Sequence, residues 1–119
     1  LKDAVTEYFQ AGFNNKPHGQ INLVMHGLDH LADGGSFTLI TGILTQHPVE
    51  KSVVASPFNG GLEAFTYAAS TDIPRGIRIK TVSPNVVEES LDTYGAFFPC
   101  FEPVRAQSVA NSLSAPPMA

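Results

Sequence analysis

Apolar residues recur at helical spacing in two segments near the start of the chain. In residues 19–32 they repeat at i, i+3, i+4 and i+7, which predicts a strong amphipathic helix. Residues 1–13 show a weaker version of the same spacing. The segment 14–17 lies between them, and Pro17 is expected to break the first helix because proline has no backbone N–H. The second helix is expected to end at Asp33-Gly34-Gly35, where glycine supplies the left-handed C-cap conformation.

Two runs rich in β-forming residues follow, at residues 36–41 and 77–82. Between them, residues 57–71 carry a third helical apolar face. This helix has a typical start, with Ser56 as N-cap and Pro57 at the first helical position. A strand–helix–strand order favours a right-handed parallel crossover. The sequence therefore predicts an α/β fold, a βαβ unit with parallel strands and flanking helices.

The part after the second strand predicts less regular structure. A short helical piece is expected near residues 88–91, an aromatic loop at Phe97-Phe98-Pro99 and a weak helix near residues 106–113. Residues 114–119 are expected to form a flexible tail. We interpret residues 1–119 as a single partial domain, because two parallel strands alone leave two open sheet edges and are marginally stable. The missing surface would come from an absent N-terminal half, from a second copy or from a partner.

Composition excludes some classes of function. The formal net charge is −4, and no cluster of Lys and Arg could neutralise a phosphate backbone, so nucleic-acid binding is not expected. No apolar run is long enough for a transmembrane helix, so no membrane association is expected. One cysteine, Cys100, permits no internal disulfide and is compatible with the reducing cytoplasm, where we expect the protein. Because the first residue is Leu1 and not Met, the sequence is expected to begin inside a longer protein.

Several short segments, in order, carry a resemblance to a known family. The most informative are Asn59-Gly-Gly-Leu-Glu-Ala-Phe65 and Ile77-Arg-Ile-Lys-Thr-Val-Ser-Pro84. The others are Gly19–Val24, Asp33–Leu39, Thr41–Leu44, Pro74–Arg78, Val82–Pro84 and Phe97–Pro99. Together they resemble the second half of a short-chain dehydrogenase/reductase, within a small atypical subgroup. The resemblance implies a partial Rossmann-like fold and descent from an NAD(P)-dependent oxidoreductase.

The resemblance also places the family's catalytic positions on this chain. Ala55 stands where the family has its catalytic Tyr, and Asn59 stands where it has the Lys of Tyr-x-x-x-Lys. The position of the family's Ser falls at Gly42, or at Thr41 with a shift of one residue. Neither Ala55 nor Asn59 titrates near neutral pH, so we expect a catalytically degenerate chain, a pseudoenzyme. Ser56 and Tyr67 lie nearby in sequence, and Tyr67 is expected to pack.

The cofactor expectation depends on the segment that is present. The chain has no Gly-rich strand–helix turn for a pyrophosphate, so no cofactor is expected for the isolated chain. NAD(P) is expected if an N-terminal half exists. The resemblance then implies that Pro84, Asn85 and Val86 lie at the nicotinamide end as a vestigial site, with Asn85 in place of the family's Gly.

Histidine and cysteine offer other chemistry. His26 and His30 are spaced i, i+4 and could share a metal ion, but no third ligand is evident and a solvated polar face is the favoured interpretation, so no metal is expected. His47 could serve as an acid or base if its loop overhangs the site, and is otherwise a loop histidine. Cys100 is expected to pack between aromatic residues.

Two hypotheses remain open: an oxidoreductase that is inactive as an isolated chain, and a non-catalytic homo-oligomeric assembly module derived from one. In the family the helices that match residues 19–32 and 57–71 often pair across a two-fold axis, which implies a homodimer. Small residues permit close approach of such helices, and Leu62 and Phe65 are expected to be buried in the contact. The small residues are Gly60, Gly61, Ala64, Ala68 and Ala69.

Overall fold

The computed structural model describes residues 1–2, 4–49, 52–97 and 102–114. Its helices are α1 (Thr6–Gly27), α2 (Ala55–Ala69), α3 (Leu91–Tyr94) and α4 (Ala106–Ser114), and its strands are β1 (Ser36–Ile40) and β2 (Arg78–Val82). Short 3-10 turns lie at Leu28–His30, Ile43–Thr45, Glu88–Ser90 and Gly95–Phe97. In the described part of the chain, no helix is long and apolar enough to cross a membrane.

The sheet consists of β1 and β2, which pair in parallel with Ser36 opposite Arg78 and Ile40 opposite Val82. The ladder continues one step further, because the backbone N–H of Thr41 donates to the carbonyl of Val82 at 2.9 Å. The prediction of an α/β fold with a parallel βαβ unit is confirmed. Each strand is one residue shorter than the run that predicted it.

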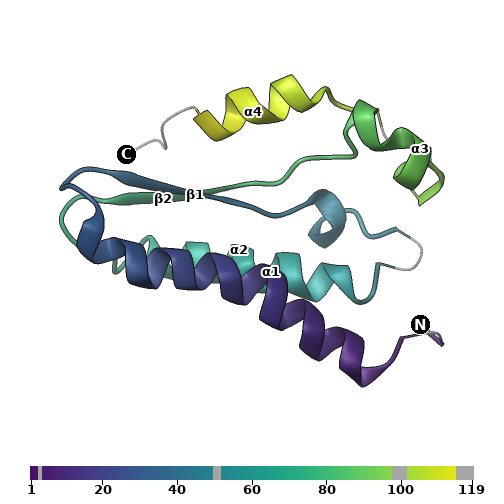
Figure 1. Ribbon diagram of the computed structural model, residues 1–119, viewed down its shortest axis with the longest axis horizontal. Coiled ribbons are helices and arrows are strands. Elements are labelled where there is room, and N and C mark those ends of the chain that lie inside the picture. Colours follow the sequence, from purple (N-terminus) through teal and green to yellow (C-terminus); the bar gives the residue numbers. More distant parts are fainter. Residues whose placement is uncertain (3, 50–51, 98–101, 115–119) are drawn as a thin grey trace.

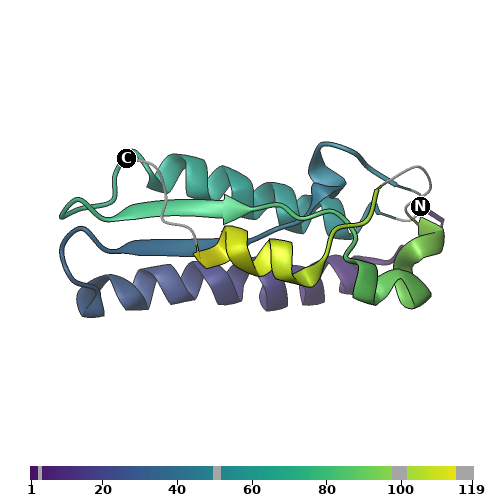
Figure 2. The same cartoon turned by 90° about the horizontal axis from the view of Figure 1, so that it is seen from above.

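Helices cover both faces of the sheet. Helices α1 and α2 lie side by side against one face, and α4 lies over the other (Figures 1 and 2). The ammonium of Lys80 on β2 donates to the carbonyl of Ser112 on α4 at 2.7 Å, which fastens α4 to the strand.

The hydrophobic core fills the space between the sheet and the α1–α2 layer. Phe37 and Leu39 point into it from alternate positions of β1, as expected for a strand with one buried face. Leu62 of α2 is fully buried here, and Phe65 packs against the same cluster. These two side chains therefore stabilise the chain's own core, which corrects the expectation that they serve contact with a second copy. The remaining buried members are Val24 and Ile77.

The first two predicted helices form one continuous helix, α1, with Pro17 inside it. The prediction of a break at residues 14–17 was wrong. Pro17 costs the helix one backbone hydrogen bond. This cost is offset because Pro17 and Val24 become buried and because the ring of Phe13 packs edge-to-face on that of Phe58 in α2, with 4.8 Å between the ring centroids. Figure 1 shows that α1 changes direction along its length, as proline-containing helices do.

The start of α2 also differs from its prediction. The helix begins at Ala55 with Val54 as N-cap, and no side chain caps it. The hydroxyl of Ser56 instead donates to the carbonyl of Leu44 at 3.2 Å, so Ser56 ties α2 to the segment after β1. Pro57 lies within the first turn, where its missing N–H costs no intrahelical bond.

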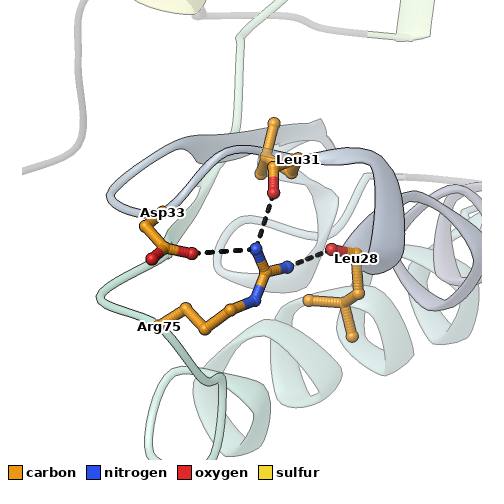
Figure 3. A network of polar contacts seen from close by, with 4 residues as sticks. All are labelled: Leu28, Leu31, Asp33 and Arg75. Atoms are coloured by element: carbon orange, nitrogen blue, oxygen red, sulfur yellow. Dashed lines mark hydrogen bonds and ion pairs between the residues drawn. The ribbon is translucent and has the colours of Figure 1, made fainter.

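Arg75 fastens the connection between α2 and β2 to the end of the α1 segment (Figure 3). Its guanidinium donates to the carbonyls of Leu28 and Leu31, the latter at 2.7 Å, and pairs with the carboxylate of Asp33 at 3.0 Å. Arg75 has a φ of 59°, and the backbone N–H of Gly34, whose own φ is 74°, donates to the carbonyl of Arg75 at 2.9 Å. A glycine of this segment was expected to be left-handed as a helix C-cap. Gly34 has that conformation, but it belongs to this turn and lies beyond the end of α1, whose C-cap is Leu28.

Candidate functional site

The four positions that the resemblance assigns to catalysis lie close to the carboxyl end of β1. Thr41 and Gly42 directly follow the strand, while Ala55 opens α2 and Asn59 comes one turn later. A Cβ atom built on Gly42 would lie 3.1 Å from the amide nitrogen of Asn59, so these two residues are in close contact. In open α/β sheets ligands bind beyond the carboxyl ends of the strands, which makes this end the candidate functional site.

Asn59 is buried in an unusual way. Its residue is only 3% exposed, and its side-chain oxygen Oδ1 has no hydrogen-bond partner among the described residues. A buried polar atom without a partner costs about 1–3 kcal/mol. Sequence reasoning had identified Asn59 only as a lost lysine and did not foresee this orphan acceptor.

The segment of Pro84, Asn85 and Val86 lies at the carboxyl end of β2, next to the same site. The carbonyl of Pro84 accepts a hydrogen bond from the N–H of Ile43 at 3.2 Å, which joins the segment to the turn after β1. The side chain of Asn85 donates to the carbonyl of Glu102 at 2.9 Å and accepts from the N–H of Val86 at 2.7 Å. Val86 itself is buried. The polar groups that the resemblance assigns to a cofactor are thus paired within the chain.

A cluster of hydroxyl groups around one carboxylate bridges the two strand ends. The carboxylate of Glu63 on α2 accepts from the hydroxyl of Ser83 at 2.9 Å and from that of Thr41 at 3.2 Å. The hydroxyls of Thr41 and Ser83 also contact each other, and the amide of Gln46 donates to Glu63 at 3.2 Å. Sequence analysis singled out only Thr41 of this group. Glu63 lies about twenty residues from both Thr41 and Ser83 along the chain, so no local spacing points to it.

This cluster forms one end of an open pocket of about 350 Å³ between α2 and β2. The pocket is lined by Gln46, Glu63, Thr66, Tyr67, Ser70, Ile79, Thr81 and Ser83. Tyr67 is 84% exposed, so the expectation that it packs was wrong. Tyr67 lines the open pocket while most of its surface remains exposed, whereas Leu62 and Thr66 lie on the buried face of α2.

His26 and His30 lie at the end of α1 that precedes β1, away from the carboxyl end of that strand, whereas His47 lies in the segment after β1. His26 lies in the last turn of α1 and His30 in the following 3-10 turn, and both are exposed. Within the described ranges, no three His, Cys, Asp or Glu side chains are grouped so that they could hold a metal ion. His47 follows the turn Ile43–Thr45 and its N–H donates to the carbonyl of Ile43 at 2.9 Å. Cys100 lies outside the described residues.

One titratable group near this end of the sheet has a shifted pKa. Burial among neighbouring atoms lowers the pKa of the Lys16 ammonium below its ordinary value, because desolvation disfavours the charged form. Lys16 lies on α1, one helical turn before Gln20. The side-chain amide of Gln20 pairs with the free edge of β1 by donating to the carbonyl of Ile40 at 2.9 Å and accepting from its N–H at 2.8 Å.

No protein-family model matches this chain, but individual proteins and solved structures are similar to it. A crystal structure of a protein from Listeria innocua is 46% identical in sequence and superimposes with a TM-score of 0.90, covering 94% of this chain and 56% of that one. An uncharacterised oxidoreductase of Methylorubrum extorquens is 29% identical over 97 residues, which are 80% of this chain and 39% of the relative.

A small-chain dehydrogenase solved in complex with NADPH has the same fold, with a TM-score of 0.79 at 22% identity over 94% of this chain and 57% of that one. These likenesses confirm the resemblance to short-chain dehydrogenases/reductases and the Rossmann-like character of the fold. The chain spans 39% to 57% of the length of these relatives.

Proposed function

We propose that this chain is the C-terminal half of an oxidoreductase related to the short-chain dehydrogenases/reductases and that it is not catalytic in isolation. The observation that carries the proposal is the arrangement at the carboxyl end of β1. Asn59 of α2 lies against Gly42, and Ala55 begins the same helix one turn earlier, where the resemblance expects a Lys and a Tyr respectively. Neither side chain can supply the proton that reduction of a carbonyl group requires at neutral pH.

The cofactor side of the site supports the same proposal. The sequence carries no Gly-rich turn for the pyrophosphate of NAD(P). The amide of Asn85 and the carbonyl of Pro84 are already paired with backbone groups of the chain. The residues present do not fit a dinucleotide, and we assign no chemical step to one. In a longer protein, NAD(P) would be held mainly by the segment that this chain lacks.

An activity assay tests this proposal. The purified chain, incubated with NADPH and a panel of aldehydes and ketones, should cause no loss of NADPH absorbance above the buffer rate. The small-chain dehydrogenase that is known to bind NADPH provides a positive control for cofactor quality. Turnover by the purified chain, at a rate that follows its concentration through gel filtration, would contradict the proposal.

A second candidate function is a homo-oligomeric assembly module, and the surface of α2 favours it. Gly61, Ala64 and Ala68 are exposed and follow one another at i, i+3 and i+7. On the neighbouring helix α1, Leu23 is 58% and Met25 57% exposed. Small residues beside exposed apolar side chains permit close packing of two helices from another copy, and the proposed assembly is a homodimer through α1 and α2.

Light scattering tests the assembly through a charged substitution. Ala68→Glu should convert a dimer into a monomer, because the carboxylate would be buried in the contact without a partner. Ala110→Glu on α4 is a matched control, since Ala110 is exposed on the opposite face of the sheet. An identical mass for the wild-type chain and both variants would contradict the assembly through α2.

A further inference from the structure

The pocket between α2 and β2 is lined largely by hydroxyl groups whose protons are already used within the chain. The hydroxyl of Ser83 donates to the carboxylate of Glu63 at 2.9 Å. The hydroxyls of Thr66 and Ser70 donate to backbone carbonyls of α2 at 3.0 and 2.7 Å. A hydroxyl group has a single proton, so these three side chains have only oxygen lone pairs left for a ligand. The pocket is therefore rich in hydrogen-bond acceptors.

Glu63 adds a negative charge to these acceptors. Its carboxylate accepts hydrogen bonds from two hydroxyls and one amide, all of them neutral, which fix its orientation without compensating its charge. The ion pairs of the described residues lie elsewhere, at Arg75 and Arg105. A carboxylate has about four lone-pair sites, so that of Glu63 can accept a further hydrogen bond. A cationic donor is the group that this arrangement leaves room for.

The remaining walls of the pocket contain an aliphatic and an aromatic side chain. Ile79 and Thr81 line the pocket from alternate positions of β2, and Tyr67 lines it from α2. Lys80, between the two strand residues, belongs to the opposite face of the sheet, where its ammonium donates to the carbonyl of Ser112 on α4. The cation of this strand is thus directed away from the pocket, and Glu63 is the charged residue among those that line it.

We propose that this pocket binds a small organic ammonium ion, with Glu63 as its counter-charge. An ammonium group carries three donors and no acceptor, which matches a carboxylate surrounded by hydroxyl oxygens, and hydrogen bonds between charged partners are the strong ones. The carbon chain of the ligand would lie against Ile79 and Tyr67. The volume of about 350 Å³ is at the small end of the range for ligand pockets. The inference goes beyond the proposed function, because it involves neither the cofactor nor a carbonyl substrate.

Titration of the isotope-labelled chain with n-butylammonium chloride, followed by nuclear magnetic resonance, tests the site. The backbone amide signals of Gln46, Thr66, Ser70 and Thr81 should shift and saturate together. At the same concentrations n-butanol, which has no charge, sodium butyrate, which has the opposite charge, and potassium chloride, which has no N–H donor, should leave these signals unchanged.

An isosteric substitution then tests the role of the carboxylate. Glu63→Gln keeps the shape of the side chain and removes its charge, so it should weaken the binding of n-butylammonium about tenfold or more. Glu88→Gln is the matched control, since Glu88 is exposed and lies outside the pocket. This control variant should bind n-butylammonium as the wild type does.

A second variant keeps the proposal testable if Glu63→Gln does not fold. Tyr67 is 84% exposed, so Tyr67→Ala leaves the core intact and should weaken the binding about threefold or more through loss of one apolar wall. Shifts that do not saturate, an equal response to n-butanol or potassium chloride, or an unchanged Kd in both pocket variants would overturn the assignment. These results do not depend on NAD(P) or on carbonyl reduction, so failure here is distinguishable from failure of the proposed function.

Discussion

Arg75 offers the sharpest test of how the fold is held together, because one side chain joins three parts of the connection around β1 and β2. Replacement by Ala removes the donors to the carbonyls of Leu28 and Leu31 and the ion pair with Asp33. Those two carbonyls belong to the end of the α1 segment, where the helix itself provides no partner. The loss in the free energy of unfolding of this variant therefore measures how much the cap on this helix end contributes to stability.

The magnitude follows from exposure. The side chain of Arg75 is 37% exposed and that of Asp33 80%, so the ion pair is screened by solvent and contributes about 0–1 kcal/mol. Each carbonyl regains water when the guanidinium is removed, so each hydrogen bond contributes about 0.5–1 kcal/mol. Arg75→Ala should therefore lower the free energy of unfolding by about 1–3 kcal/mol in total.

A glycine variant separates the guanidinium from the backbone. Arg75 has a φ of 59°, a conformation that costs an L-residue about 1 kcal/mol or more and costs glycine almost nothing. Arg75→Gly should therefore be more stable than Arg75→Ala, although both lack the guanidinium. Urea unfolding followed by circular dichroism measures all three proteins. An Arg75→Ala midpoint equal to that of the wild type, or a less stable Arg75→Gly, would refute the reasoning.

Two further predictions concern packing and chemistry. Gly12→Ala should destabilise the chain by about 1–3 kcal/mol in thermal or urea unfolding, because the new methyl group would overlap the ring of Phe58. A Cβ atom built on Gly19 of the same helix would have no neighbouring atom within 4 Å, so Gly19→Ala should stabilise the chain by about 0.5–1 kcal/mol. Equal effects of the two substitutions on stability would contradict the packing described. The double variant Ala55→Tyr and Asn59→Lys should show no carbonyl reduction with NADPH, since the turn that would bind the cofactor is still absent, and measurable turnover would contradict this.

Local patterns were enough to predict the βαβ unit. The apolar face of residues 57–71 and the two flanking β-rich runs each depend on neighbours in sequence. The parallel pairing of the strands follows from the helix that connects them as a crossover. The continuous α1 was missed for the opposite reason. The cost of Pro17 is visible in the sequence, whereas the contacts that offset it come from Phe58 and the core, distant in the chain.

The candidate site was predicted only in part. Thr41, Gly42, Ala55 and Asn59 were located through the resemblance, and the structure brings them to one end of the sheet. The carboxylate of Glu63 was missed because its hydroxyl partners lie about twenty residues away on either side along the chain. Partners at such separation leave no periodic signal, and only the packing of α2 over both strand ends reveals them.

Calorimetric titration of NADPH and NADH into the purified chain tests the central claim most directly. The account predicts no binding heat with either cofactor, because the groups of Pro84 and Asn85 are paired within the chain and no Gly-rich turn is present to bind the pyrophosphate. The same titration with the small-chain dehydrogenase known to bind NADPH confirms that binding is measurable under the conditions used. Saturable binding by the unmodified chain with a micromolar Kd, about −8 kcal/mol, would contradict the account and identify a working cofactor site.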